Sequence, residues 1–256
     1  MQSEIYRKSG SGVPPGYFAW EAMGLRWLRV SGGAPVVDVL RVEDSGLELR
    51  HLASVPATRE AAHAFGQRLA VTHEAGAPAY GSPPAGWVGD GFFGPVDEPL
   101  GMPLRPVASW GAFWAEQRLL PMVAEAIRRR ELAVSDGRIA ERVAARLVSG
   151  EFDTGEPPAR IHGDLWSGNI MWTADGATLI DPAAHGGHRE TDLAMLALFG
   201  APQLRDIVEG YQECSPLAPG WAERVALHQV HALLVHAVLF GGGYAMTCRS
   251  VLARYA

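Results

Sequence analysis

The segment IHGDLWSGNIMW places Asp164 and Asn169 five positions apart in an otherwise apolar stretch. Two strand-like runs, NIMWT and ATLID, flank an Ala-Asp-Gly turn and predict an antiparallel hairpin. With the turn centred on Asp175, Asn169 and Asp181 lie side by side at the open end of the hairpin. A short loop delivers Asp164 to the same end. We therefore expect two carboxylates and one carboxamide to converge.

Three oxygen-bearing side chains of this kind suit Mg²⁺, which binds one or two carboxylates and fills its other positions with water and phosphate. Residues 161–188 contain no Lys or Arg that would neutralise them. In phosphoryl transfer, metal neutralises the phosphates while a carboxylate accepts the proton of the attacking hydroxyl. The pattern favours Asn169 and Asp181 as metal ligands and Asp164 as the base. A structural alternative stays open, in which all three only make turn and loop contacts.

Composition excludes several classes of protein. The 256 residues are 48% hydrophobic, so the chain can bury a sizeable core. A net charge of −6 gives no global positive field that would recruit nucleic acid or an anionic membrane. Two cysteines, Cys214 and Cys248, are too few for a disulfide framework or a zinc site. The first residues lack the apolar core of a signal peptide, and we expect a monomer in the cytoplasm.

The segment 225–248 is the one candidate for a membrane span, because it contains no Asp, Glu, Lys or Arg. It also contains histidines, a glutamine and the glycine run 241–243, which are costly in lipid or break helices. These features favour a buried core helix followed by a close-packed turn. The spacing of the histidines does not suit a metal site, so we interpret them as core residues. They are His228, His231 and His236.

The sequence pattern divides the chain into 1–53 and 54–256. The first part is predicted to hold short strands around one helix, and the second to be mainly helical. The Gly- and Pro-rich stretch 76–107 is predicted to be a long surface loop. Helices are predicted over three stretches: Thr58 to His73, Ser109 onward with a kink at Pro121, and Ser135 to Ser149.

Four segments resemble the fructosamine kinases, also called ketosamine 3-kinases: HGDLWSGNIMW, LIDPAAHGGHRETDLAMLALFG, WGAFWAEQRLLP and LFGGGY. The D-x-x-x-x-N spacing alone would indicate only a kinase-like phosphotransferase, whereas HGDLW followed by GHRETDLAM is specific to this family. The resemblance implies an α+β, two-lobed protein-kinase-like fold of the aminoglycoside-phosphotransferase branch. Its N-terminal sheet lobe is small and its C-terminal lobe mainly helical.

The resemblance also implies an activity. Such enzymes use ATP and Mg²⁺ to phosphorylate the O3 hydroxyl of a ketosamine, either free or formed on a glycated lysine of a protein. The 3-phosphate is unstable, so the amine is eventually set free and the glycation is reversed.

Site residues carried over from the resemblance agree with the three oxygen donors described above. Lys8 is similar to the strand lysine that grips the α- and β-phosphates, and Glu21 to the helix glutamate that positions this lysine. Main-chain groups of Arg50 and Leu52 would meet adenine, although the family usually has a glutamate where Arg50 stands.

Four further residues receive roles from the resemblance. Trp166 would lie beside the sugar, with a core tryptophan as the alternative. His188 would either brace the catalytic loop or contact the substrate. His162 and Asp192 would support the catalytic loop, Asp192 through hydrogen bonds to the backbone.

The start of the chain departs from the pattern. Kinases of this kind cover ATP with a glycine-rich hairpin before the lysine strand, which needs about 15 residues. Only seven residues precede Lys8, and the glycines of 10–12 follow it. We expect a truncated small lobe without this lid. Three explanations stay open: a reduced lobe, a gene start placed too late, or a protein that has given up fast catalysis.

Two other functions stay open at this point. One is a kinase of the same fold for another hydroxylated amine, which would turn over Mg-ATP but ignore fructosyl-lysine. The other is a non-catalytic module that binds ATP or ketosamine, which would be stabilised by ligand without transferring phosphate.

Overall fold

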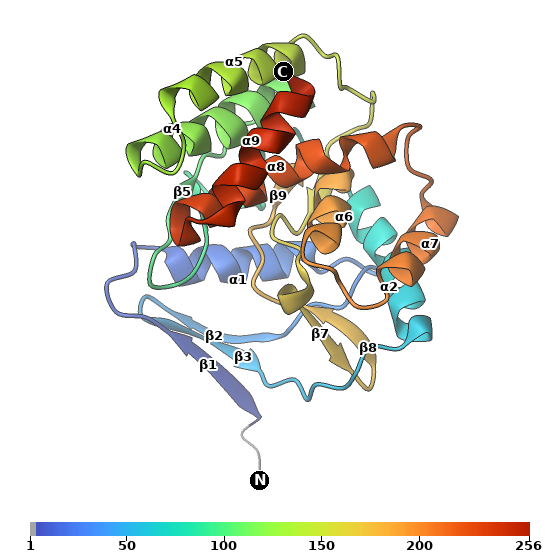
Figure 1. Cartoon of the computed structure of the whole chain (residues 1–256). Helices are drawn as coiled ribbons and strands as arrows, with labels where there is room; N and C mark the ends of the chain where they lie inside the picture. The colour runs from blue at the N-terminus through green and yellow to red at the C-terminus, as the bar shows by residue number, and fades with distance from the viewer. Residues whose placement is uncertain (1–3) are drawn as a thin grey trace.

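A small antiparallel sheet opens the fold. The computed structural model describes residues 4–256. Its first elements are β1 (Ile5–Ser9), α1 (Tyr17–Leu28), β2 (Val39–Glu43) and β3 (Gly46–Arg50). The strands pair in the order β1-β3-β2, and α1 lies along the sheet (Figure 1). Residues 1–3 lie outside the described part, so the predictions for 1–53 and for a missing hairpin fall partly on residues that are not described, and both stay predictions.

The remainder is mainly helical, as predicted. Its helices are α2 (Arg59–Glu74), α3 (Trp110–Trp114), α4 (Leu120–Arg128), α5 (Val134–Val148), α6 (Arg189–Leu198), α7 (Leu204–Cys214), α8 (Trp221–Phe240) and α9 (Gly243–Tyr255). Three two-stranded pairs interrupt them: β4 (Gly91–Phe93) with β5 (Leu100–Met102), β6 (Ala159–Ile161) with β9 (His185–Gly187), and β7 (Ile170–Thr173) with β8 (Gly176–Leu179). In Figure 1, α4, α5 and α9 lie at the end of the molecule opposite the sheet.

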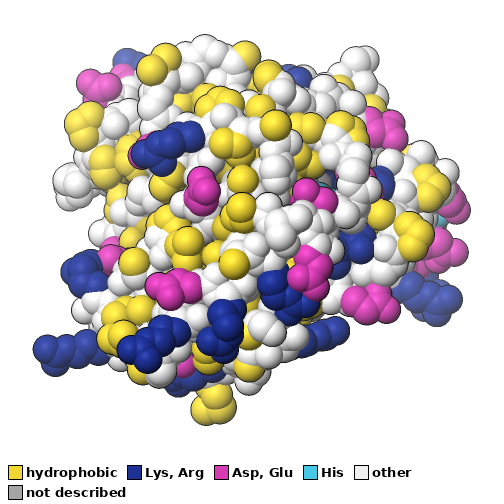
Figure 2. Space-filling view, turned by 90° about the horizontal axis from the view of Figure 1, so that it is seen from above, with side chains coloured by type: hydrophobic (Ala, Val, Ile, Leu, Met, Phe, Trp, Pro, Cys, Tyr) yellow, Lys and Arg dark blue, Asp and Glu magenta, His cyan; other side chains and the backbone are white. Residues whose placement is uncertain are grey.

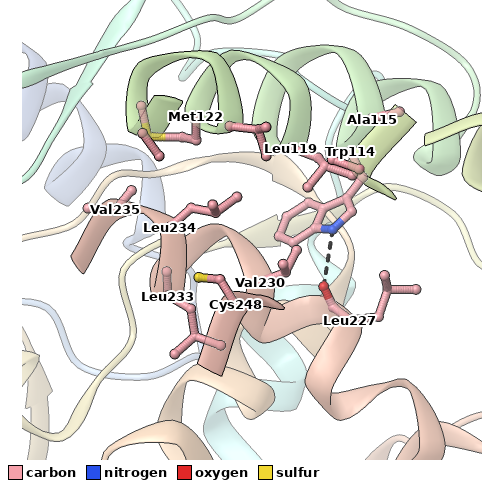
Figure 3. Close-up of a cluster of buried hydrophobic side chains, with 14 of the residues drawn as sticks. Trp114, Ala115, Leu119, Met122, Leu227, Val230, Leu233, Leu234, Val235 and Cys248 are labelled. Atoms are coloured by element: carbon pink, nitrogen blue, oxygen red, sulfur yellow. Dashed lines mark hydrogen bonds between the residues drawn. The ribbon is translucent and has the colours of Figure 1, made fainter. Parts of the chain in front are cut away.

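One apolar cluster holds the helices of this far end together. Trp114 and Leu119 face Leu227 and Val230 of α8, and all four side chains are buried (Figure 3). The Trp114 indole N–H donates to the carbonyl of Leu227 at 3.2 Å, so its polar edge is satisfied inside the core. Burial of each large apolar side chain contributes about 1.5–3 kcal/mol.

A second apolar cluster lies under the sheet and crosses the predicted boundary at residue 54. Leu25 of α1 and Leu47 of β3 belong to the same cluster as Leu69 of α2 and Leu179 of β8. Since this core is continuous, no gap in packing separates 1–53 from 54–256. The division into these two lobes therefore stays a prediction.

The starts of the predicted helices follow their caps. Thr58 accepts a hydrogen bond from the amide of Ala61 at the start of α2, and Ser109 does the same for Ala112 at the start of α3. Helix α5 begins one residue earlier than predicted. There the Asp136 carboxylate accepts from the amide of Ala133 at 2.8 Å, so Asp136 closes the first turn.

The kink predicted at Pro121 takes the form of a π-helical turn, η1 (Ala115–Leu119), between α3 and α4. Pro121 then stands in the first turn of α4, where its missing amide N–H costs no hydrogen bond. The extra residue of the π turn directs Gln117 and Arg118 toward the segment 103–105. The Gln117 amide binds both main-chain groups of Arg105, at 2.8 and 2.7 Å.

The prediction of a surface loop over 76–107 is wrong for its central part. Residues 91–102 form the β4–β5 hairpin, in which Phe93, Leu100 and Met102 are buried. The Trp20 indole N–H of α1 donates to the carbonyl of Phe92 at 3.0 Å. Glycines and prolines set the turns of this segment, but its apolar residues alternate over two short strands that pack inward.

The prediction of a close-packed turn at the glycine run 241–243 is wrong for Gly242 and Gly243. Gly241 has φ 63° and ψ −148°, and Gly242 has φ 67° and ψ −136°, a region that essentially only glycine adopts. No atom lies within 4 Å of a Cβ built on Gly242 or Gly243. Gly242 therefore serves the backbone path from α8 to α9 rather than close packing, whereas a Cβ on Gly241 would lie only 3.2 Å from the Glu131 carboxylate.

The lengths and hydropathies of the described helices bear on the candidate membrane segment 225–248. Among the described residues, no helix is both long enough and apolar enough to cross a bilayer, which agrees with α8 as a core helix. On the face shown in Figure 2, side chains of both charges lie among apolar and uncharged ones. Such mixing is expected for a chain with a small net charge.

Close packing of α2 against α7 generates a stability prediction. A Cβ on Gly66 would lie 2.0 Å from the Ile207 carbonyl oxygen, and one on Gly210 would lie 2.1 Å from that of His63. Gly66→Ala must therefore push the helices apart, and we expect it to lower the free energy of unfolding by at least about 2 kcal/mol. Urea denaturation measures this. Gly243→Ala, where a Cβ meets open space, is the control and should change stability by less than about 1 kcal/mol.

Candidate active site

A buried lysine joins three distant parts of the chain. The Lys8 ammonium of β1 lies 2.8 Å from the Glu21 carboxylate of α1 and 3.0 Å from the Asp181 carboxylate after β8. Only 17% of the Lys8 side chain and 6% of the Glu21 side chain are exposed. Burial disfavours the charged ammonium, but the two carboxylates outweigh it and raise the pKa of Lys8. Lys8 is therefore held as a cation.

The β7–β8 hairpin brings Asn169 and Asp181 together, but not in the predicted register. Thr173 pairs with Gly176, so the turn has two residues, and the Ile180 amide donates to the carbonyl of Asn169 at 3.1 Å. The predicted pairing of Asn169 with Asp181 is thus wrong by one residue, because a two-residue turn closes the hairpin earlier. Asp181 adopts φ 51°, a left-handed conformation, as the chain leaves β8.

Asn169 holds the loop that carries Asp164. Its side-chain amide donates to the main-chain carbonyl of Asp164 at 2.8 Å, to its carboxylate at 3.2 Å and to the carbonyl of Asp181 at 3.3 Å. Part of Asp164 faces a cavity, yet burial raises the pKa of its carboxyl group to about 7, against the opposing hydrogen bond from Asn169. Asp164 thus titrates near neutrality, where a general base is most effective.

Two oxygen atoms at this point suit a hard cation. Asn169 uses its NH₂ group for all three contacts above, and within residues 4–256 its Oδ1 atom has no hydrogen-bond partner. The Asp181 carboxylate accepts from Lys8 through its Oδ1 atom, and 40% of its side chain is exposed. A carboxamide and a carboxylate oxygen are ligands that Mg²⁺ prefers, so this donor set fits magnesium.

Asp192 braces the same loop from behind. Its carboxylate accepts from the amides of His162 and Gly163, at 2.7 and 2.9 Å, and lies 3.1 Å from a ring nitrogen of His73. Gly163 has φ 81°, and a Cβ there would lie 2.2 Å from the Ala183 carbonyl oxygen, so only glycine fits. The His162 ring bridges the Asp164 amide and the carbonyl of Ile180.

Asp164, Asn169 and Asp181 all line one cavity of about 380 Å³. Lys8, Asp164 and Asp181 line one side of it. The other walls are mainly aromatic and apolar, and come from α1, the β4–β5 hairpin and the end of α8: Tyr17, Trp20, Phe92, Phe93, Val235, His236, Leu239 and Phe240. Trp166 also lines the cavity, with 40% of its surface exposed.

Few sequence patterns indicate these walls. The Tyr17 hydroxyl donates to the carbonyl of Gly94 at 3.3 Å, which ties the hairpin turn to α1. The motif GFFG before a Pro-containing turn was the one local signal of a hairpin here. Nothing local could have shown that α8 supplies the wall opposite, and His236, interpreted as a core residue, faces the cavity.

Three residues predicted to contact nucleotide or substrate do not line the cavity. The amide of Arg50 donates to the carbonyl of Asp38, and its guanidinium pairs with the Asp38 carboxylate at 2.8 Å. Its main-chain amide is therefore already occupied and is not available to a nucleotide base. Leu52 follows β3 outside the cavity. His188 is buried at the start of α6, where its ring accepts from the amide of Glu190 and bonds to Thr154. The structure thus does not bring His188 to the substrate position.

A second cluster of possible metal ligands is already neutralised. His188, Glu190 and His228 place ligand atoms within 4.8 Å of one another. However, the Arg224 guanidinium binds both oxygens of Glu190, at 2.9 and 2.5 Å. The Arg224 guanidinium therefore already neutralises the Glu190 carboxylate. His228 is buried, which agrees with its interpretation as a core residue.

Comparison with known proteins agrees with the sequence motifs. Residues 14–256 match the family model described as fructosamine kinase. A protein from Synechocystis sp., named a probable ketoamine kinase, is 37% identical over 190 residues, which are 73% of this chain and 60% of the relative. The chain thus spans about three fifths of that relative's length.

Solved structures agree with the fold. A crystal structure from Thermobifida fusca, assigned by name as a fructosamine-3-kinase, has a TM-score of 0.89 and 46% identity, covering 98% of this chain and 85% of that one. The aminoglycoside phosphotransferase APH(4)-Ia has a TM-score of 0.57 and 14% identity, covering 98% and 87%, and shares the fold alone. The predicted protein-kinase-like fold is confirmed.

The raised pKa of Asp164 predicts a pH-dependent stability. Between its ordinary pKa near 3.8 and its folded value of about 7, the folded state binds a proton more tightly than the unfolded state. Ionisation of Asp164 therefore lowers the free energy of unfolding as the pH rises from about 4 to about 7. Asp164→Asn removes this cost, and we expect it to raise the free energy of unfolding by about 1–3 kcal/mol at pH 8 and by much less at pH 5.

Urea denaturation at the two pH values checks this expectation. Asp175→Asn, at the exposed turn of the β7–β8 hairpin, is the matched control and should show no such difference. An Asp164→Asn variant that is less stable at pH 8 than the unmodified protein would contradict the argument from burial.

Proposed function

Because the chain belongs to the fructosamine kinase family, we propose that it transfers the γ-phosphate of ATP to the O3 hydroxyl of ketosamines. The convergence of Lys8, Asp164, Asn169 and Asp181 on one cavity carries the proposal. These residues supply a fixed cation for phosphate oxygens, a base and hard oxygen ligands in one place. That combination is what phosphoryl transfer needs.

Asp164 serves as the base in this proposal. The acceptor hydroxyl oxygen attacks the γ-phosphorus, and its proton passes to the Asp164 carboxylate. The bond from this phosphorus to the bridging oxygen breaks, and ADP leaves. Asn169 holds the base in place through its two hydrogen bonds to Asp164. Positioning of the two reactants is a major part of catalysis in this class of reaction.

Lys8 and the metal ligands balance the charge of the nucleotide. Lys8, held by Glu21, would contact the α- and β-phosphates. Asn169 and Asp181 would hold Mg²⁺, which neutralises phosphate charge when bound. The carbonyl of Arg50 and the main chain of Leu52 would meet adenine at the end of β3.

The mouth of the cavity suits an acceptor with a large substituent. Trp166 and Phe240 are 40% and 63% exposed, so the cavity opens to solvent beside them. A ketosamine could enter with its amine substituent outward, whether it is a free metabolite or a glycated lysine of a protein. Phosphorylation at O3 would then lead to release of the amine.

An activity assay tests the proposal. We expect the protein to transfer phosphate from Mg-ATP to fructosyl-lysine or ribulosyl-lysine, and Asp164→Asn to lower kcat by about 10²-fold or more because the base is lost. Asp175→Asn is the control and should keep full activity. Turnover with another hydroxylated amine alone would indicate a different acceptor. Thermal stabilisation by ATP with no transfer to any acceptor would indicate a binding module.

The pKa of Asp164 sets the expected pH dependence. A base must be unprotonated, so with a pKa of about 7 we expect kcat/KM to fall about tenfold per pH unit below that value and to be level above it. Initial rates between pH 5.5 and 8.5 at low acceptor concentration check this. A profile that stays level down to pH 5.5 would exclude Asp164 as the titrating base.

A further inference from the structure

His236 is a cavity-lining histidine with one unprotonated ring nitrogen. Its ring lines the cavity near the end of α8, and its Nδ1 atom lies 2.8 Å from the carbonyl oxygen of Ala232. A carbonyl oxygen only accepts, so Nδ1 carries the proton and Nε2 is left as an acceptor. Burial lowers the pKa of His236, which favours this neutral ring. His236 takes no part in the phosphoryl transfer proposed for this cavity.

Aromatic rings surround His236. The ring centroids of Phe199, Tyr244 and Phe240 lie 4.8, 5.1 and 5.5 Å from that of the imidazole. Phe199 also lies 6.1 Å from Trp166, on the loop that carries Asp164. The faces of such rings attract cations, most strongly where water is excluded. His236 thus combines a hydrogen-bond acceptor with a surrounding that favours positive charge.

The charges of the cavity favour the same kind of ligand. Among the described residues that line it, Lys8 is the one lysine or arginine, and Glu21 and Asp181 both pair with it. Asp164 has no cationic partner among them. A ligand group near His236 would therefore meet acceptors and aromatic faces but no competing cation.

We propose that His236 binds the protonated amine nitrogen of the acceptor, with Nε2 accepting a hydrogen bond from its N–H group. Phe240 and Trp166 flank this ammonium group at the mouth of the cavity, and Asp164 accepts the hydroxyl proton deeper inside. This inference rests on the proposed function and deepens it, because it makes the amine, rather than the sugar alone, a recognised part of the substrate.

The test compares an amine with its amine-free counterpart. The substrates are 1-deoxy-1-(butylamino)fructose and 1-deoxyfructose, and the variants are His236→Leu and His236→Gln. We expect His236→Leu to raise KM for the amine about tenfold or more and to change KM for 1-deoxyfructose and kcat for the amine less than about threefold. His236→Gln, whose side-chain oxygen can replace Nε2, should restore most of the affinity. His63→Leu on α2 is the control.

A binding measurement separates this inference from the proposed function. The 3-deoxy analogue of the amine has no O3 hydroxyl, and its Kd from calorimetry does not depend on turnover. A tenfold weaker Kd in His236→Leu supports the inference. An unchanged Kd, or an equal loss of affinity for amine and amine-free compounds, overturns it while leaving the kinase proposal intact. If the unmodified protein neither binds nor phosphorylates ketosamines, both the kinase proposal and the proposed role of His236 are wrong.

Discussion

The ion pairs that Lys8 forms with Glu21 and Asp181 are the constraint on which the site depends. They join β1, α1 and the segment after β8; Lys8 and Glu21 lie mostly out of water, whereas 40% of the Asp181 side chain is exposed. Removal of Glu21 or Lys8 would leave the other as a largely buried charge that lacks its main partner, which is far more costly than an exposed pair is favourable. Because Asn169 contacts both Asp181 and Asp164, the position of the carboxylate that faces the cavity follows from the same set of contacts.

The β4–β5 hairpin, which forms the opposite wall of the cavity, is held by hydrogen bonds at both of its ends. The β4–β5 hairpin is bound to α1 through Trp20, and its exit is bound to the π turn through Gln117 and Arg118. Arg118 is buried without a carboxylate in contact, and burial lowers its pKa to about 9. It donates to main-chain carbonyls and lies 4.5 Å from the centre of the Phe113 ring. Arg118 is thus a buried cation, which is energetically costly, and its hydrogen bonds fix the shape of the cavity wall.

Local chemistry could be predicted from the sequence, and distant packing could not. The convergence of Asp164, Asn169 and Asp181 follows from a short loop and one hairpin, so spacing sufficed. The register was missed by one residue because turns of two and three residues leave nearly the same local pattern. Lys8 and Glu21 could be predicted as site residues only from the family resemblance, because nothing in the sequence around a single lysine indicates that it is buried. The role of His236 as a wall residue depends on how α8 packs against the hairpin, which no local pattern contains.

Asp164, which is partly buried, and Asp192, which is fully buried, show how one fold gives the same residue type two different states. Burial would raise the pKa of Asp192, but hydrogen bonds from His73 and from the amide of His162 lower it, so Asp192 stays charged and holds the loop. Asp164, with a single side-chain donor in Asn169, has its pKa raised to about 7. Environments that push the pKa values of two like groups apart separate a structural anion from a group able to exchange a proton near neutral pH. The number of donors around each carboxylate, rather than its depth alone, decides which state it takes.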